Sequence, residues 1–123
     1  MRDSETKEEQ ILQAVAKFER EQMDFSPSSI LVNLQYDTVY VMLQGMTFPA
    51  ERACARNEHG QEMLERYHAQ IFDAGKHALE SEIQVILGRT VERSTMRVEP
   101  VSGNGVIQFT LGKTTGKGEG RPQ

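Results

Sequence analysis

Residues 58–88 read EHGQEMLERYHAQIFDAGKHALESEIQVILG, and this stretch decides the fold because it is the longest uninterrupted helical pattern in the chain. No proline interrupts it, and Gly88 stands where a left-handed C-cap residue is expected. We therefore predict an amphipathic helix roughly 40 Å long at 1.5 Å per residue. Its apolar residues recur at spacings of three and four, the period of one helix face; they are Met63, Leu64, Tyr67, Ile71, Ala78, Leu79, Ile83, Ile86 and Leu87.

The composition is that of a soluble globular protein, which bounds the classes of function. With 123 residues, of which 37% are hydrophobic and 26% charged, the chain is expected to form one domain with its own core. A single cysteine excludes an intramolecular disulfide, and neither a signal peptide nor a transmembrane segment is visible. The cytoplasm is therefore the expected compartment. A net charge of −4 disfavours attraction to phosphate backbones, so nucleic acid is not an expected partner.

A first helix is predicted at the start of the chain. Residues 4–23 carry an apolar stripe with helical spacing, followed by a break at Pro27. Thr6 and Glu9 have the spacing of a capping box, while Ser4 is an alternative start.

A hairpin and a short helix come next. From residue 30 the apolar period changes to two, and two β-rich runs, 30–36 and 39–44, flank a predicted turn at 37–38. The short helix that follows has Thr47 as its predicted N-cap and Pro49 in its first turn.

A second hairpin and a tail follow the long helix. Residues 90–98 are β-prone, 100–105 supply a loop, and 106–111 are the strongest strand signal in the chain. Residues 112–123 contain four glycines and no aliphatic side chain, so they are predicted to form a disordered Gly-rich tail. The basic residues of this tail would contact anionic lipid or nucleic acid only weakly. The predicted domain is therefore residues 1–111.

Strands grouped before and after the helices predict an α+β domain. Its sheet has four mainly antiparallel strands from the two hairpins, with the long amphipathic helix packed across it and an N-terminal and a short helix beside it. A strand of seven residues spans roughly 23 Å, so a helix of roughly 40 Å overhangs such a sheet. Either the first helix or a second subunit covers the excess. We favour a homodimer, because symmetric pairs are the commonest oligomers.

Spacing argues against the candidate catalytic and metal sites. His59, His68 and His77 lie nine residues apart and half a turn out of phase, so they cannot share a metal within one helix. Asp73 and His77 have i, i+4 spacing, but two ligands are too few for a structural site. Cys54 has no sequence cue for a partner base and is predicted to be a small buried side chain. We therefore predict no catalytic residue, no metal and no cofactor.

Five short segments between positions 30 and 111, made mainly of caps, turns and strand residues, form a pattern that can be compared with known families. Its segments are Val41-Met42-Leu43-Gln44-Gly45, Pro49-Ala50-Glu51, Gly60 followed by Arg66, Gly88-Arg89-Thr90-Val91 and Val106-Ile107-Gln108-Phe109-Thr110-Leu111. Together they resemble the MpsC-like family, small proteins named for a proposed sodium-translocating system that generates membrane potential. The resemblance implies a small soluble bacterial protein without a demonstrated enzymatic activity, accessory to a membrane system, and it implies no catalytic residues. The chain departs from the family in the loop Glu99-Pro100-Val101-Ser102, where an Asp is expected.

Besides association with a membrane surface through the Gly-rich tail, two functions are open from the sequence. The first is a non-enzymatic, dimeric accessory or regulatory protein that works through protein contacts, at a membrane ion-translocating system as the resemblance implies. The second is a protein or enzyme that binds a small anionic ligand in a pocket between helix and sheet. In that case Arg66 holds the anion, with Tyr40 or Tyr67 nearby. A surface ion pair is the plainer interpretation of Arg66.

Overall fold

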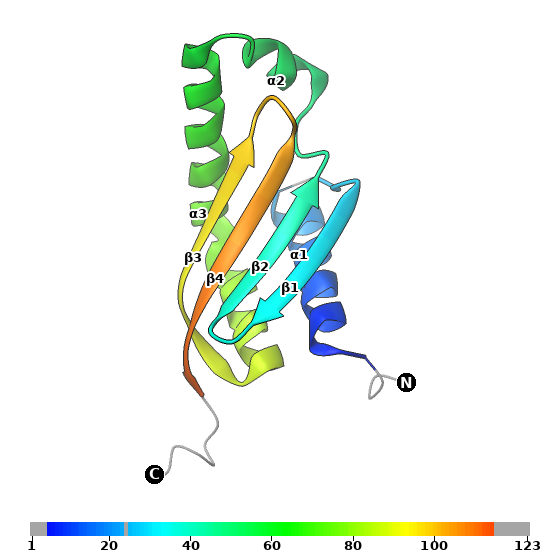
Figure 1. Cartoon of the computed structure of the whole chain (residues 1–123), viewed down its shortest axis with the longest axis vertical. Helices are drawn as coiled ribbons and strands as arrows, with labels where there is room; N and C mark the ends of the chain where they lie inside the picture. Colours follow the sequence, from blue (N-terminus) through cyan, green and yellow to red (C-terminus); the bar gives the residue numbers. More distant parts are fainter. Residues whose placement is uncertain (1–4, 24, 115–123) are drawn as a thin grey trace.

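A four-stranded sheet with helices on one of its faces makes up the fold (Figure 1). The computed structural model describes residues 5–23 and 25–114. Every strand pairing is antiparallel, and the strand order is β1-β2-β4-β3. The predicted α+β architecture with a long helix across the sheet is confirmed. In chain order the elements are α1 (Lys7–Gln22), β1 (Ser29–Gln35), β2 (Thr38–Gln44), α2 (Pro49–Cys54), α3 (Glu58–Leu87), β3 (Arg89–Glu99) and β4 (Asn104–Thr114).

The caps predicted at Thr6 and Gly88 are confirmed, and the structure adds Asn57 as the cap at the start of the long helix. The Thr6 hydroxyl accepts a hydrogen bond from the Glu9 backbone N–H at 3.1 Å, and the Glu9 carboxylate accepts one from the Thr6 N–H at 3.0 Å. This capping box fixes the start of α1 at Thr6. The Asn57 side chain caps the start of α3, and Gly88 ends α3 with a φ of 67°. Glycine suits this end because it adopts a left-handed φ at little steric cost.

The turn of the first hairpin lies at Tyr36-Asp37, so the predicted turn at 37–38 was wrong by one residue. Tyr36 takes a positive φ of 38°. The Arg89 side chain holds this turn: it donates to the Tyr36 carbonyl at 2.8 Å and to the Asp37 carboxylate at 2.6 Å. Its third bond, to the Gly112 carbonyl at 2.9 Å, ties the turn to the end of β4. The turn therefore depends on a contact that is remote in the sequence.

The start of α2 also differs from the prediction, because Phe48 and not Thr47 is its N-cap. The Phe48 backbone N–H donates to the Glu51 carboxylate at 3.0 Å. Thr47 is buried, and its carbonyl accepts from the Arg52 guanidinium at 2.9 Å. The Thr47 hydroxyl oxygen accepts from the same guanidinium group at 3.4 Å.

The connection from α2 to α3 brings two backbones very close together. Cys54, predicted to be buried, is exposed at the end of α2, and the next residue, Ala55, is buried instead. The prediction was wrong because the short helix turns Ala55 and not Cys54 toward the interior. A Cβ added at Gly60 would lie 1.9 Å from the Cys54 carbonyl oxygen. A glycine at position 60 therefore permits this close approach.

The second hairpin is longer than predicted. β3 and β4 have 11 residues each, or roughly 36 Å, which approaches the roughly 45 Å of the 30-residue α3. The overhang that favoured a homodimer is therefore small, and α1 packs beside α3 on the same side of the sheet (Figure 1). β4 runs to Thr114, three residues past the predicted domain end. The rest of the predicted tail, 115–123, lies outside the described residues.

The core lies between the sheet and the two long helices. The rings of Phe18 on α1 and Phe72 on α3 meet edge to face, with centroids 5.9 Å apart. The inward face of β2 is fully apolar, since alternate residues of this strand are buried. Other buried members of this core include Ile11, Val15, Val39, Val41, Leu43, Leu79, Ile83, Ile107 and Phe109.

Replacing Gly60 with alanine is expected to destabilise the protein by about 1–3 kcal/mol, because a side chain here forces the two backbones apart. Gly75→Ala is the matched control on the same helix. Its added Cβ would meet its nearest neighbours at an ordinary 3.6 Å, and alanine gains about 1 kcal/mol of helix propensity over glycine. Urea denaturation followed by circular dichroism measures both free energies of unfolding. A Gly60→Ala variant as stable as the wild type would contradict the close approach.

Candidate functional site

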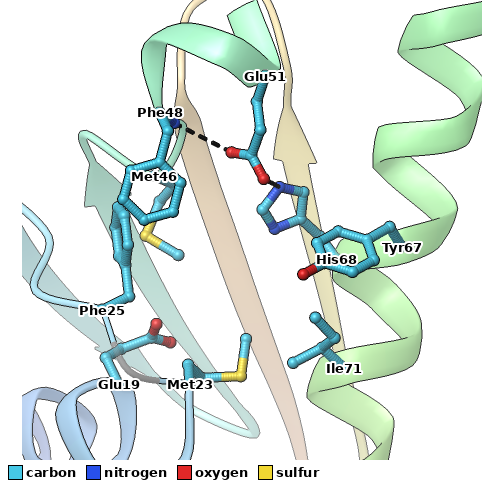
Figure 2. A pocket seen from close by; sticks show the side chains of 9 residues that line it. All are labelled: Glu19, Met23, Phe25, Met46, Phe48, Glu51, Tyr67, His68 and Ile71. Atoms are coloured by element: carbon cyan, nitrogen blue, oxygen red, sulfur yellow. Dashed lines mark hydrogen bonds and ion pairs between the residues drawn. The ribbon is translucent and has the colours of Figure 1, made fainter. Parts of the chain in front are cut away.

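A cavity lies where the end of α1, the start of α2 and the first half of α3 meet (Figure 2). It offers about 60 Å³ to the centres of water molecules, whereas one water needs roughly 10–15 Å³. A small organic molecule therefore fits it better than a drug-sized ligand does. The lining residues are Glu19, Met23, Phe25, Met46, Phe48, Glu51, Tyr67, His68 and Ile71.

Glu19 is the most unusual residue of this cavity. It is 0% exposed, its carboxylate points into the cavity (Figure 2), and neither oxygen has a hydrogen-bond partner among the described residues. Burial raises the pKa of Glu19 from 4.5 to about 7, because desolvation disfavours the charged carboxylate. A buried carboxylate without partners costs stability. Such a group is more typical of a functional site than of a structural one.

The position of Glu19 follows from the helical period of α1. It lies four residues after Val15 and eight after Ile11, so it falls on the buried side of the helix. The chain then turns back, and the Phe25 backbone N–H donates to the Glu19 carbonyl at 2.9 Å. Our sequence interpretation missed Glu19. The signal that would have found it is an acidic residue inside an apolar stripe.

Glu51 and His68 form the opposite wall. One Glu51 carboxylate oxygen accepts from the Phe48 N–H, and the other lies 3.7 Å from Nε2 of His68 (Figure 2). This Nε2 is buried and has no hydrogen-bond partner within the described part of the chain. Burial lowers the pKa of His68, and the nearby Glu51 charge offsets this only partly. The imidazole is therefore neutral at neutral pH and does not neutralise Glu51.

Phe25, Phe48 and Tyr67 form an aromatic wall beside these acidic groups. The rings of Phe25 and Phe48 meet edge to face, with centroids 5.2 Å apart. Tyr67 contacts the His68 ring in the same way at 5.5 Å. The remaining lining residues are methionines and an isoleucine. The site is thus an apolar, aromatic cavity into which two carboxylates project, and it suits a ligand with an apolar body and hydrogen-bond donors.

The structure does not bring together the three residues predicted to hold an anionic ligand. Tyr67 lines the cavity, whereas Arg66 is exposed and lines an open hollow together with Arg97 and two glutamates. Tyr40 alternates with the buried residues of β2, which places it on the face of the sheet opposite the helices. An anion at Arg66 stays a prediction.

The other histidines of α3 lie outside this cavity. Nδ1 of His77 lies 3.3 Å from the Glu80 carboxylate, while Asp73 pairs with Lys76 at 3.4 Å. Within residues 5–23 and 25–114, no group of three or more His, Cys, Asp or Glu side chains is arranged to hold a metal ion.

The ionisation of Glu19 is expected to make stability fall as the pH rises. Between pH 4.5 and about 7 the folded state keeps a proton that the unfolded state has lost, so the free energy of unfolding decreases over this range. The difference between 4.5 and about 7, at about 1.36 kcal/mol per pH unit, amounts to about 3 kcal/mol. The lowered pKa of His68 acts oppositely and destabilises the folded state below pH 6.5. Because the two effects oppose each other, a variant at Glu19 is needed to measure its contribution to the pH dependence of stability.

Glu19→Gln is expected to lose this pH dependence. As the pH rises from about 4.5 to about 8, the free energy of unfolding of the wild type should therefore fall by about 3 kcal/mol relative to that of Glu19→Gln. Glu21→Gln, an exposed position on the same helix, is the control and should follow the wild type. Urea denaturation across this pH range measures all three proteins. Parallel curves for Glu19→Gln and the wild type would refute the raised pKa.

Comparison with known proteins identifies the family. The family model described as Na+-translocating membrane potential-generating system (MpsC) matches residues 3–113. The searches of curated proteins and of solved structures found no match. No helix in the described ranges is both long and apolar enough to cross a bilayer. Because the matched residues include every helix and strand except the last residue of β4, as well as the whole cavity, the chain belongs to the MpsC family.

Proposed function

We propose that this protein is a non-enzymatic accessory or regulatory component of a sodium-translocating membrane system in bacteria, acting from the cytoplasm through contacts with another protein. The family description supports the link to the membrane system. The observation that carries a regulatory role is Glu19, a fully buried carboxylate without a hydrogen-bond partner among the described residues, at the wall of a cavity. In this proposal the cavity holds a small ligand that controls the contact.

The cavity is well placed to affect the arrangement of the helices. Glu19 comes from α1, Glu51 from α2 and His68 from α3, so a ligand that contacts them bridges three elements. Such a ligand stabilises the arrangement that binds it best.

Apolar side chains surround the same site on the outside. Phe48 and Tyr67 both line the cavity and are 53% and 51% exposed. Met63, one turn before Tyr67 on α3, is 45% exposed. Exposed apolar groups that lie together are typical of protein contact sites. Ligand binding and partner binding would therefore share residues.

The proposal predicts a loss of sodium-dependent membrane potential when the gene is deleted in the native organism. The full chain and the Glu21→Gln control should restore the potential, whereas Glu19→Gln should not, because it removes the Glu19 carboxylate from the cavity. A voltage-sensitive dye measures the potential in cells energised by a sodium gradient, with protein levels compared by immunoblot. An unchanged potential in the deletion strain would overturn the proposed function.

The homodimer predicted from the sequence is the second part of the proposal. Its support is Val85, an apolar residue of α3 that is 84% exposed, together with the frequency of symmetric pairs. Size-exclusion chromatography with light scattering is expected to give twice the 13.9 kDa chain mass. Val85→Ser should shift the protein toward the monomer. A wild type that is monomeric at micromolar concentration would contradict the dimer.

A further inference from the structure

The groups that face the cavity give it an acidic character. Its titratable residues are Glu19 from α1, Glu51 from α2, and Tyr67 and His68 from α3. The segment before α2 contributes only Met46 and Phe48. His68 is neutral, so the ionised carboxylates are not balanced by a positive side chain among these residues. An anionic ligand is therefore repelled, and a cation is attracted.

The other lining atoms indicate what kind of cation this is. A hard metal ion takes about six or more oxygen ligands. The lining side chains offer only the two carboxylates and the Tyr67 hydroxyl as oxygen donors, and the rest are aromatic, thioether and aliphatic. Aromatic faces attract an organic cation within about 6 Å of the ring centre. The lining therefore favours an ammonium group with an apolar body.

We propose that this cavity binds a small alkylammonium ion, whose N–H groups donate to the Glu19 carboxylate and whose alkyl part lies against the aromatic wall. The inference rests on the proposed function, in which the cavity is a ligand site, and it names the class of ligand. Both Glu19 oxygens lack partners among the described residues, and charged N–H donors satisfy them directly. The cavity offers about 60 Å³ to the centres of water molecules, against roughly 10–15 Å³ for one water, so it has room for an ion with a short alkyl chain.

Binding is linked to a proton. Near neutral pH part of the protein carries a protonated Glu19. When the alkylammonium ion binds, the carboxyl O–H bond breaks, the proton leaves for the solvent, and the carboxylate pairs with the ammonium group. Binding should therefore tighten as the pH rises toward about 8, while the amine itself stays protonated.

Isothermal titration calorimetry on the full chain at about pH 8 tests the ligand class with four probes of similar size. Butylammonium is expected to bind saturably. 1-Butanol, which is neutral, and butyrate, which is anionic, should bind at least about tenfold more weakly, because each lacks the charge-assisted N–H bonds. Tetramethylammonium keeps the charge but has no N–H donor, so it should also bind more weakly than butylammonium.

Variants assign the binding to Glu19. Glu19→Gln is expected to weaken butylammonium binding by at least about tenfold, while the exposed control Glu21→Gln leaves it unchanged. Glu51→Gln keeps an oxygen that can accept from the Phe48 N–H, so it retains the cap of α2 while removing the second charge. It should weaken binding less than Glu19→Gln does. Circular dichroism confirms that each variant is folded.

Proton release tests the inference without any variant. Near pH 7, the binding heat of the wild type should differ between buffers of different ionisation enthalpy, because each binding event releases a fraction of a proton. Absence of butylammonium binding, equal binding of 1-butanol, or binding by Glu19→Gln as tight as that of the wild type would overturn the inference. Binding of butyrate or 1-butanol alone would keep the cavity as a ligand site but change the ligand class. The membrane-potential measurement judges the proposed function separately.

Discussion

The contact between Phe18 and Phe72 is the constraint on which the rest of the structure depends. Phe72 is fully buried at the middle of α3, and Phe18 meets it edge to face at an interplanar angle of 80°. This contact fixes α1 beside α3, and the two helices together then cover one face of the sheet. Glu19 follows Phe18 directly, so the side chain that completes the core also determines where the carboxylate lies. Core and candidate site are therefore coupled through one turn of α1.

Glu19 opposes the stability that this core provides. A carboxylate in an apolar cavity is destabilising when ionised, and with a pKa of about 7 it can gain or lose its charge near neutral pH. Proteins break local rules of this kind mainly at functional sites, where a ligand or a switch compensates the cost. The aromatic wall strengthens this interpretation, since Phe48 and Tyr67 remain half exposed although the core beside them is closely packed. A ligand that fills the cavity would both cover these rings and give the Glu19 carboxylate a hydrogen-bond partner.

The cavity was not predictable because its residues come from three separate parts of the chain, 19–25, 46–51 and 67–71. Spacing within one helix correctly separates His68 from the other histidines, but it says nothing of Glu51, which reaches His68 from α2. Glu19 lies in line with the apolar residues of α1, but only the packing of this helix shows that its carboxylate is fully buried. Arg66 and Tyr67 are adjacent in sequence but line different hollows, because neighbouring residues of a helix point about 100° apart.

The sequence by itself determined the order and class of the elements, the caps at Thr6 and Gly88, and the family resemblance. These features depend on hydrogen bonds between residues close together in the sequence and on the spacing of apolar residues, both of which can be inferred from the sequence. Only the tertiary structure decided the turn at Tyr36, the exposure of Cys54 and the cavity around Glu19. Each of these depends on contacts between residues that are far apart in the sequence. Burial, and the pKa shift that follows from it, arise only when the chain is packed and water is excluded.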